Sequence, residues 1–98
     1  MTIEDNLYEK SIKILTDLIA FKTVSGQDNS ELINYCEKIL NDLEIETFKV
    51  FDENKIRVHL FGTLKAKKTN GKKPIILSGH TDVVPVSKGW SSDPFTAT

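Results

Sequence analysis

The stretch that decides the fold runs from Pro74 to Val86 and reads PIILSGHTDVVPV. Its first part, residues 74–77, is apolar at every position, which is typical of a strand covered on both faces in an α/β sheet. A proline in first position is compatible with the start of a strand. Because ligands of open α/β sheets bind just past the carboxyl ends of such strands, residues 78–82 are expected to carry the chemistry.

Upstream of this strand, the spacing of apolar residues predicts two helices and a hairpin. Apolar side chains recur at helical spacing over 6–21 and again over 31–43. The period then changes to two, which predicts strands at 45–51 and 56–61. The short polar connection 52–55 indicates that these strands are antiparallel. The predicted order is therefore helix, helix, strand, strand, strand, in an α/β fold.

Two connections contain recognisable local signals. Asp28 lies three residues before Glu31, the spacing of a capping box at the start of the second helix, and Ser30 is an alternative cap. Residues 65–73 hold five lysines around Asn70-Gly71. This pattern favours a solvated connection with a turn inside it, although the same lysines could attract an anionic partner.

Composition limits the classes of function. The 98 residues, treated as one domain over 1–98, carry 13 basic and 14 acidic side chains and a net charge of -1, which disfavours nucleic acid and anionic lipid as partners. The single cysteine, Cys36, excludes an internal disulfide. We find no signal-peptide pattern at the N-terminus and no apolar run of about 20 residues. A cytoplasmic protein with no membrane partner is expected.

His80 and Asp82 are the candidate site residues. Gly79 lets the backbone turn beside His80 and leaves room next to the imidazole. Residues two apart in an extended segment point to the same side, so Asp82 can hydrogen-bond one ring nitrogen while the other binds a metal. The alternative is a structural His-Asp pair that closes a loop, which is the commoner meaning of an isolated His-x-Asp.

The longer string continues with Gly89-Trp90 and Asp93-Pro94-Phe95. Together with residues 77–86 it resembles the M20 zinc peptidase and amidohydrolase family and, within that family, the acetylornithine deacetylases. Residues 18–25 are similar to the family's first helix and the loop after it. The resemblance can be laid over nearly the whole chain, but only residues 77–95 are specific.

The resemblance implies a fold and a metal centre. Residues 1–98 would be the N-terminal fragment of a zinc-peptidase-like, three-layer α/β/α catalytic domain, with no second domain in this chain. His80 would ligate one of two zinc ions, with cobalt as a possible substitute, and Asp82 would orient that histidine. The third strand would lie parallel beside the first, in the order 2-1-3, whereas the short connections favour a 1-2-3 meander.

The resemblance also implies a reaction. A small N-acylated amino acid would be hydrolysed, with N-acetyl-L-ornithine giving ornithine and acetate in arginine biosynthesis, and the full-length enzyme would be a homodimer. Succinyl-diaminopimelate desuccinylase or another aminoacylase is the rival within the family. A non-catalytic fragment or interaction module is the rival from another class.

The remaining candidate residues add no further ligands. A zinc site needs three or four protein ligands, and the only other histidine, His59, falls within a predicted strand. The isolated chain is therefore expected to be inactive. Cys36 lies on the apolar stripe of the second helix and is expected to act as a small hydrophobe. Trp90 and Phe95 are expected to anchor their loop on the core, with a substrate pocket as the alternative.

Overall fold

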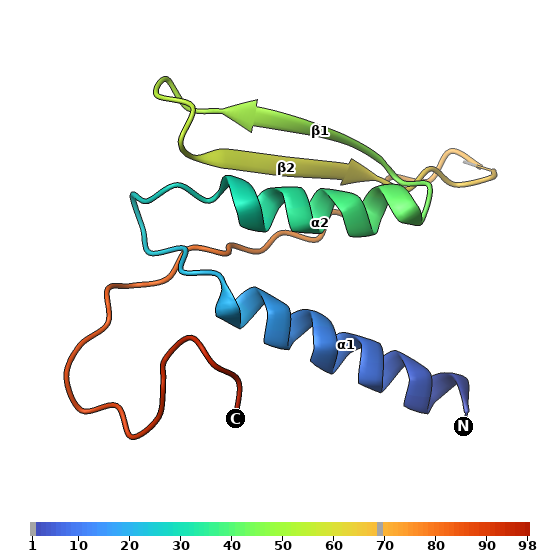
Figure 1. The fold of residues 1–98 in the computed structure, drawn as a ribbon. Helices are drawn as coiled ribbons and strands as arrows, with labels where there is room; N and C mark the ends of the chain where they lie inside the picture. Colours follow the sequence, from blue (N-terminus) through green and yellow to red (C-terminus); the bar gives the residue numbers. More distant parts are fainter. Residues whose placement is uncertain (1, 69) are drawn as a thin grey trace.

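A computed structural model describes residues 2–68 and 70–98 of the chain; Met1 and Thr69 lie outside the described residues. It contains helix α1 (Ile3–Ala20), helix α2 (Ser30–Asp42), strand β1 (Glu46–Phe51) and strand β2 (Val58–Thr63). Figure 1 shows α2 lying against the β1–β2 hairpin, with α1 on the side of α2 away from the hairpin. Neither helix in the described part of the chain is long and apolar enough to cross a membrane.

Helix α1 begins earlier than the apolar pattern predicted, because Thr2 and Asp5 form a capping box. The Asp5 N–H donates to Thr2 Oγ1 at 3.1 Å, and the Thr2 N–H donates to Asp5 Oδ2 at 3.3 Å. These contacts satisfy two of the N–H groups that a helix start leaves free. None of the residues of α1 is buried, and its main anchor is the end of the helix, where Leu18 and Phe21 pack against the core.

Helix α2 has a different start from the one predicted, and the turn that ends it places a residue other than glycine in the left-handed conformation. Asp28 Oδ1 accepts from the Ser30 N–H at 2.7 Å, and the N-cap residue Asn29 makes no side-chain cap, so the predicted capping box is wrong. At the other end, Glu44 has a φ of 61°. The Glu44 N–H donates to the Asn41 carbonyl and the Ile45 N–H to the Leu40 carbonyl. This is a Schellman ending that turns the chain directly into β1.

The hairpin and α2 together hold the core. The strands pair antiparallel, with Phe48 opposite Phe61 and Val50 opposite His59, as the predicted hairpin requires. Leu32 and Ile33 of α2 and Val58 of β2 are the buried apolar residues, at 2%, 6% and 4% exposure. The helix approaches the sheet closely at one glycine. A Cβ on Gly62 would lie 3.1 Å from Leu40 Cδ1 and 3.4 Å from Ile45 Cγ2.

The side chain of Asn29 ties the start of α2 to the sheet. Its Nδ2 donates to the Val58 carbonyl at 2.9 Å, and its Oδ1 accepts from the Val58 N–H at 2.8 Å. These are the two backbone groups of Val58 that a third strand would otherwise engage. A side-chain amide therefore supplies both a donor and an acceptor to this buried edge residue.

The hairpin face away from α2 carries no helix among the described residues. Phe48 and Phe61 stack on this face with ring centroids 4.8 Å apart, and both remain about half exposed. His59, opposite Val50, shares this face and is exposed. The chain therefore has an α/β arrangement of two helices and a two-stranded antiparallel sheet. Whether it is a fragment of a three-layer domain stays a prediction.

The predicted third strand at 74–77 is wrong. The sheet has the order β1-β2 and no further member in the described chain, so neither the 2-1-3 nor the 1-2-3 order is formed. Ile75, Ile76 and Leu77 keep 89%, 84% and 93% of their surface exposed. A strand exists through ladder hydrogen bonds to a neighbour, and residues 74–77 have no such neighbour within residues 2–68 and 70–98. High β propensity alone did not produce the strand.

The lysine-rich connection contains the predicted turn. Asn70 and Gly71 have φ values of 46° and 72°, the left-handed conformation that an Asn-Gly pair adopts easily. The lysines around it in the described chain are exposed. After this turn the chain returns toward α1, and Figure 1 shows its last third, in orange and red, following an irregular path.

Candidate functional site

The site is built where the loop after α1 meets the loop that follows residues 74–77. The Ser25 N–H donates to the Val83 carbonyl at 2.9 Å, and the Val83 N–H donates to the Thr23 carbonyl at 3.0 Å. These bonds form a parallel bridge between Val24 and Val83. Two segments that lie far apart in the sequence are thus held side by side by backbone hydrogen bonds.

A buried threonine reinforces this bridge. Thr23 is buried, with 5% exposure, and its Oγ1 donates to the Thr81 carbonyl at 2.7 Å. Residues on both sides of Asp82 are therefore tied to the loop after α1, through the Thr81 carbonyl and the Val83 backbone. Thr81, which lies between His80 and Asp82, contributes its carbonyl to this anchor.

His80 and Asp82 meet as predicted. His80 Nδ1 lies 3.0 Å from Asp82 Oδ1 and 3.1 Å from the Asp82 carbonyl oxygen. Both of these oxygens are acceptors when Asp82 is ionised, so Nδ1 must carry the proton and donate. The lone pair of the neutral ring is then on Nε2. The side chain of His80 is 85% exposed, which leaves Nε2 open to solvent and to an incoming ion.

Asp82 has a second partner that sequence analysis did not find. Ser25 Oγ donates to Asp82 Oδ2 at 2.6 Å, so the two carboxylate oxygens have different neighbours. The hydrogen bond from Ser25 is the main cause that lowers the pKa of Asp82; slight burial opposes it, and the nearby His80 lowers the pKa further. Asp82 is therefore ionised at neutral pH and acts as an acceptor toward both neighbours.

The donor set of this corner fits one ligand position of a zinc site. A neutral imidazole whose Nδ1 donates to a carboxylate presents Nε2 in the form that zinc binds. Within residues 2–68 and 70–98, no three His, Cys, Asp or Glu side chains gather closely enough to hold a metal ion. His59 lies on the hairpin, on the face away from α2, and does not contribute. Among the described residues, His80 is thus the one candidate metal ligand at this corner.

Cys36 behaves as the sequence predicted. It packs against the buried cluster of Leu32, Ile33 and Val58. Burial raises the pKa of its thiol, which keeps the sulfur protonated and makes it a poor nucleophile and a poor metal ligand at neutral pH.

The aromatic residues of the last segment behave differently from each other. Phe95 is partly buried, and Lys22 Nζ lies 5.7 Å from the centre of its ring, so this residue anchors its loop beside the end of α1. Asp93 Oδ1 accepts from the Phe95 N–H at 2.8 Å and shapes the local turn. Trp90 is more than half exposed. Phe95 is thus held beside Lys22 and is not among the residues packed against the buried cluster, so its predicted anchoring on the core stays a prediction, and the same prediction is wrong for Trp90.

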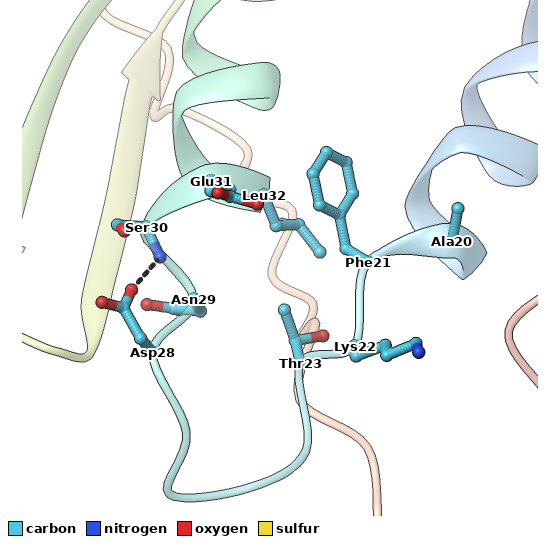
Figure 2. A pocket seen from close by; sticks show the side chains of 9 residues that line it. All are labelled: Ala20, Phe21, Lys22, Thr23, Asp28, Asn29, Ser30, Glu31 and Leu32. Atoms are coloured by element: carbon cyan, nitrogen blue, oxygen red, sulfur yellow. Dashed lines mark hydrogen bonds between the residues drawn. The ribbon is translucent and has the colours of Figure 1, made fainter.

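A cavity of about 470 Å³ adjoins the corner at the start of α2. Figure 2 shows Phe21 and Leu32 on one side of it and the Asp28–Ser30 hydrogen bond on another. Thr23 lines this cavity and also donates to Thr81, whereas His80 and Asp82 do not line it. The cavity therefore adjoins the corner, and Thr23 belongs to both.

Comparison with known proteins gives relatives of two kinds. A succinyl-diaminopimelate desuccinylase of Sulfurimonas denitrificans is 30% identical over 89 residues, which cover 91% of this chain and 22% of that protein. A protein of the same name from Orientia tsutsugamushi is 34% identical over 89 residues, covering 89% of this chain and 22% of that protein. An acetylornithine deacetylase of Klebsiella pneumoniae is 36% identical over 96 residues, covering 89% of this chain and 24% of that protein.

These alignments cover most of this chain but only a small part of each relative. The chain spans about a quarter of the length of these curated relatives, although about nine tenths of the chain is matched. No family model matches the chain. No solved structure matches it significantly. The chain is a distant homologue of the M20 acetylornithine deacetylases and succinyl-diaminopimelate desuccinylases.

Proposed function

We propose that the complete protein is a zinc-dependent hydrolase that cleaves the amide bond of an N-acylated amino acid, with N-acetyl-L-ornithine as substrate. Residues 1–98 are part of its catalytic domain, His80 is a zinc ligand and Asp82 positions that ligand. The observation that supports this most is the orientation of His80. Its Nδ1 faces two oxygens of Asp82 at 3.0 and 3.1 Å, which leaves Nε2 as the nitrogen with a free lone pair.

The residues of the corner have separate tasks in this proposal. Zinc, when bound, supplies Lewis acidity that activates water and polarises the amide carbonyl. His80 donates the Nε2 lone pair, and Asp82 keeps the ring proton on Nδ1 so that this lone pair stays available.

The other ligands belong elsewhere in the complete protein. A zinc site uses three or four protein ligands, and the described residues bring only His80 to this corner. The curated relatives are about four times as long as the matched region. The further ligands and a general base are therefore assigned to parts of the complete protein outside these 98 residues, and the isolated chain is expected to be inactive.

Succinyl-diaminopimelate is the second candidate substrate. Two relatives whose name includes this desuccinylase activity are 30% and 34% identical to the chain, close to the 36% of the acetylornithine deacetylase from Klebsiella pneumoniae. The His80–Asp82 corner is compatible with either acyl group because it serves the metal and not the substrate side chain. Substrate choice is therefore a question for direct assay.

The first test uses the protein encoded by the complete open reading frame. The wild type, His80→Ala and His59→Ala are each loaded with zinc and assayed on N-acetyl-L-ornithine and N-succinyl-diaminopimelate. His59→Ala is the matched control because it removes the chain's other histidine, which lies on the exposed hairpin face. We expect His80→Ala to lose at least a hundredfold in kcat/KM and to bind less zinc, and His59→Ala to stay within about twofold of the wild type.

The outcomes separate the remaining alternatives. Acetyl release alone supports the deacetylase, and succinyl release alone supports the desuccinylase. A complete protein that folds, binds no zinc and cleaves neither compound would falsify the hydrolase proposal and favour an interaction module. Equal losses of kcat/KM and zinc binding in His80→Ala and His59→Ala would contradict the assignment of His80 as a zinc ligand.

A further inference from the structure

We infer that Ser25 is a positioning residue of the metal corner: its hydroxyl holds the Asp82 carboxylate so that the other carboxylate oxygen meets His80 Nδ1. This inference rests on the proposed function, because it concerns the same zinc ligand. Ser25 Oγ lies 2.6 Å from Asp82 Oδ2, and Asp82 Oδ1 lies 3.0 Å from His80 Nδ1. The three side chains form one continuous chain of polar contacts.

The hydrogen bond from Ser25 to Asp82 is important because Asp82 and His80 are exposed. The side chains of Asp82 and His80 are 58% and 85% exposed, so packing does not fix their torsion angles. The terminal torsion of an aspartate has broad minima, and a carboxylate held at one oxygen alone can rotate away from its partner. A second anchor at Oδ2 removes that freedom. Ser25 supplies this anchor before an ion arrives.

The backbone of Ser25 is itself well held. Its N–H donates to the Val83 carbonyl, and the Val83 N–H returns to the carbonyl of the buried Thr23. The backbones of Ser25 and of Val83, the residue after Asp82, therefore belong to one hydrogen-bonded frame. The hydroxyl of Ser25 is presented from a fixed position and does not depend on a mobile loop.

A purely structural role is already filled by other groups. The two loops are joined by the backbone bridge of Val24 and Val83 and by the hydrogen bond from Thr23 Oγ1 to the Thr81 carbonyl. Neither contact uses the Ser25 hydroxyl. Removing this hydroxyl should therefore leave the loops joined and release only the carboxylate, which distinguishes Ser25 from Thr23.

The test compares four forms of the complete protein: wild type, Ser25→Ala, Ser25→Thr and Ser11→Ala. Ser25→Thr keeps the hydroxyl, and Ser11→Ala removes an exposed hydroxyl that donates only to the Leu7 carbonyl within α1. Three quantities are measured: the zinc Kd by chelator competition, kcat and KM separately, and the proton position on the His80 ring by ¹⁵N NMR of the zinc-free protein at a pH where the ring is neutral.

We expect Ser25→Ala to weaken zinc binding by about tenfold and to lower kcat by a similar factor, the lower end of the range for groups behind a metal ligand. KM and Tm should stay close to the wild type, and Ser25→Thr should recover most of the loss. In the zinc-free protein, the Nδ1–H form of His80 should lose population in Ser25→Ala and keep it in Ser11→Ala.

The NMR measurement separates this inference from the proposed function. If the wild type neither binds zinc nor cleaves either substrate, the proposed function fails, but a loss of the Nδ1–H form in Ser25→Ala still supports the positioning role. If zinc Kd, kcat and the ring proton of Ser25→Ala all match the wild type within twofold, the inference is overturned. A fall in Tm with an unchanged proton position on the His80 ring also overturns the inference, because Ser25 would then only stabilise the fold.

Discussion

In the unit formed by α2 and the β1–β2 hairpin, Leu32, Ile33 and Val58 are buried, whereas Ile75, Ile76 and Leu77 in the last third of the chain are almost fully exposed. The two sets contain the same kinds of side chain, so hydrophobicity does not account for the difference. The helix and the hairpin are consecutive and can fold onto each other, while residues 75–77 have no strand beside them in the described chain. Whether an apolar side chain is buried in this chain therefore depends on whether another helix or strand lies beside it.

The largest expected effect comes from truncating one leucine in each region of the 98-residue chain. Leu32→Ala should lower the free energy of unfolding by about 2 to 5 kcal/mol, because it opens a cavity in a small core. Leu77→Ala should change it by less than about 0.5 kcal/mol, since its side chain is already in water. Urea unfolding followed by circular dichroism measures both.

Similar losses for the two leucines would contradict the comparison, because they would mean that residues 75–77 are packed in solution. A cooperative unfolding transition in the wild type is the required reference. Aggregation of the wild type would indicate that exposed apolar surface drives the isolated chains together. The uncovered Phe48–Phe61 face and the exposed residues 75–77 leave much apolar surface in contact with water.

A smaller effect is expected from adding one methyl group to a glycine in each region. In Gly62→Ala the new Cβ meets Leu40 Cδ1 at 3.1 Å, so α2 or the leucine must shift, at a cost of roughly 1 kcal/mol. Gly79→Ala is the matched control, because a Cβ there has nothing within 4 Å. Thermal unfolding should show a lower Tm for Gly62→Ala alone. An unchanged Tm would contradict the expected cost, because it would mean that the Leu40 methyl group moves aside freely.

The smallest effect concerns the pH dependence of the contact between the loop before α2 and the last third of the chain. The Ser25 hydrogen bond lowers the pKa of Asp82 below its unfolded value of about 3.9, so ionised Asp82 favours the joined loops. This contribution is complete above the unfolded pKa and is lost as pH falls through the lowered folded pKa. Carboxyl ¹³C NMR of the metal-free 98-residue chain should give a low midpoint for Asp82, which rises in Ser25→Ala. A midpoint unaffected by Ser25→Ala would assign the shift to another cause.

The helices and the hairpin could be predicted because their signals are local. The apolar stripe of α2, with Leu32 facing the core, and the short polar turn before β2 are both readable from neighbouring residues. The third strand could not be predicted in this way. An apolar run such as residues 75–77 shows that a segment is suited to a sheet, but the partner that makes it a strand is a nonlocal feature.

In the candidate site, too, the local contact could be predicted and the nonlocal contact could not. The contact between His80 and Asp82 follows from their two-residue spacing and was predicted. The contact between Ser25 and Asp82 spans 57 positions, and nothing in the residues around Ser25 points to Asp82. The only available signal was the position of Thr23-Val24-Ser25 directly after a helix, where β-branched residues favour extended backbone that can pair with another segment.

The sequence separation of the bridge between residues 23–25 and 81–83 also has a kinetic consequence. Closing a loop of 57 positions costs roughly 2 kcal/mol more chain entropy than closing the hairpin between Phe51 and Val58. Contacts with such separation form after local ones, so the hairpin is in place first and the His80 corner assembles late. If the complete protein binds zinc as proposed, a chain that is still folding offers no ready place for the ion, and zinc capture would then report the end of folding.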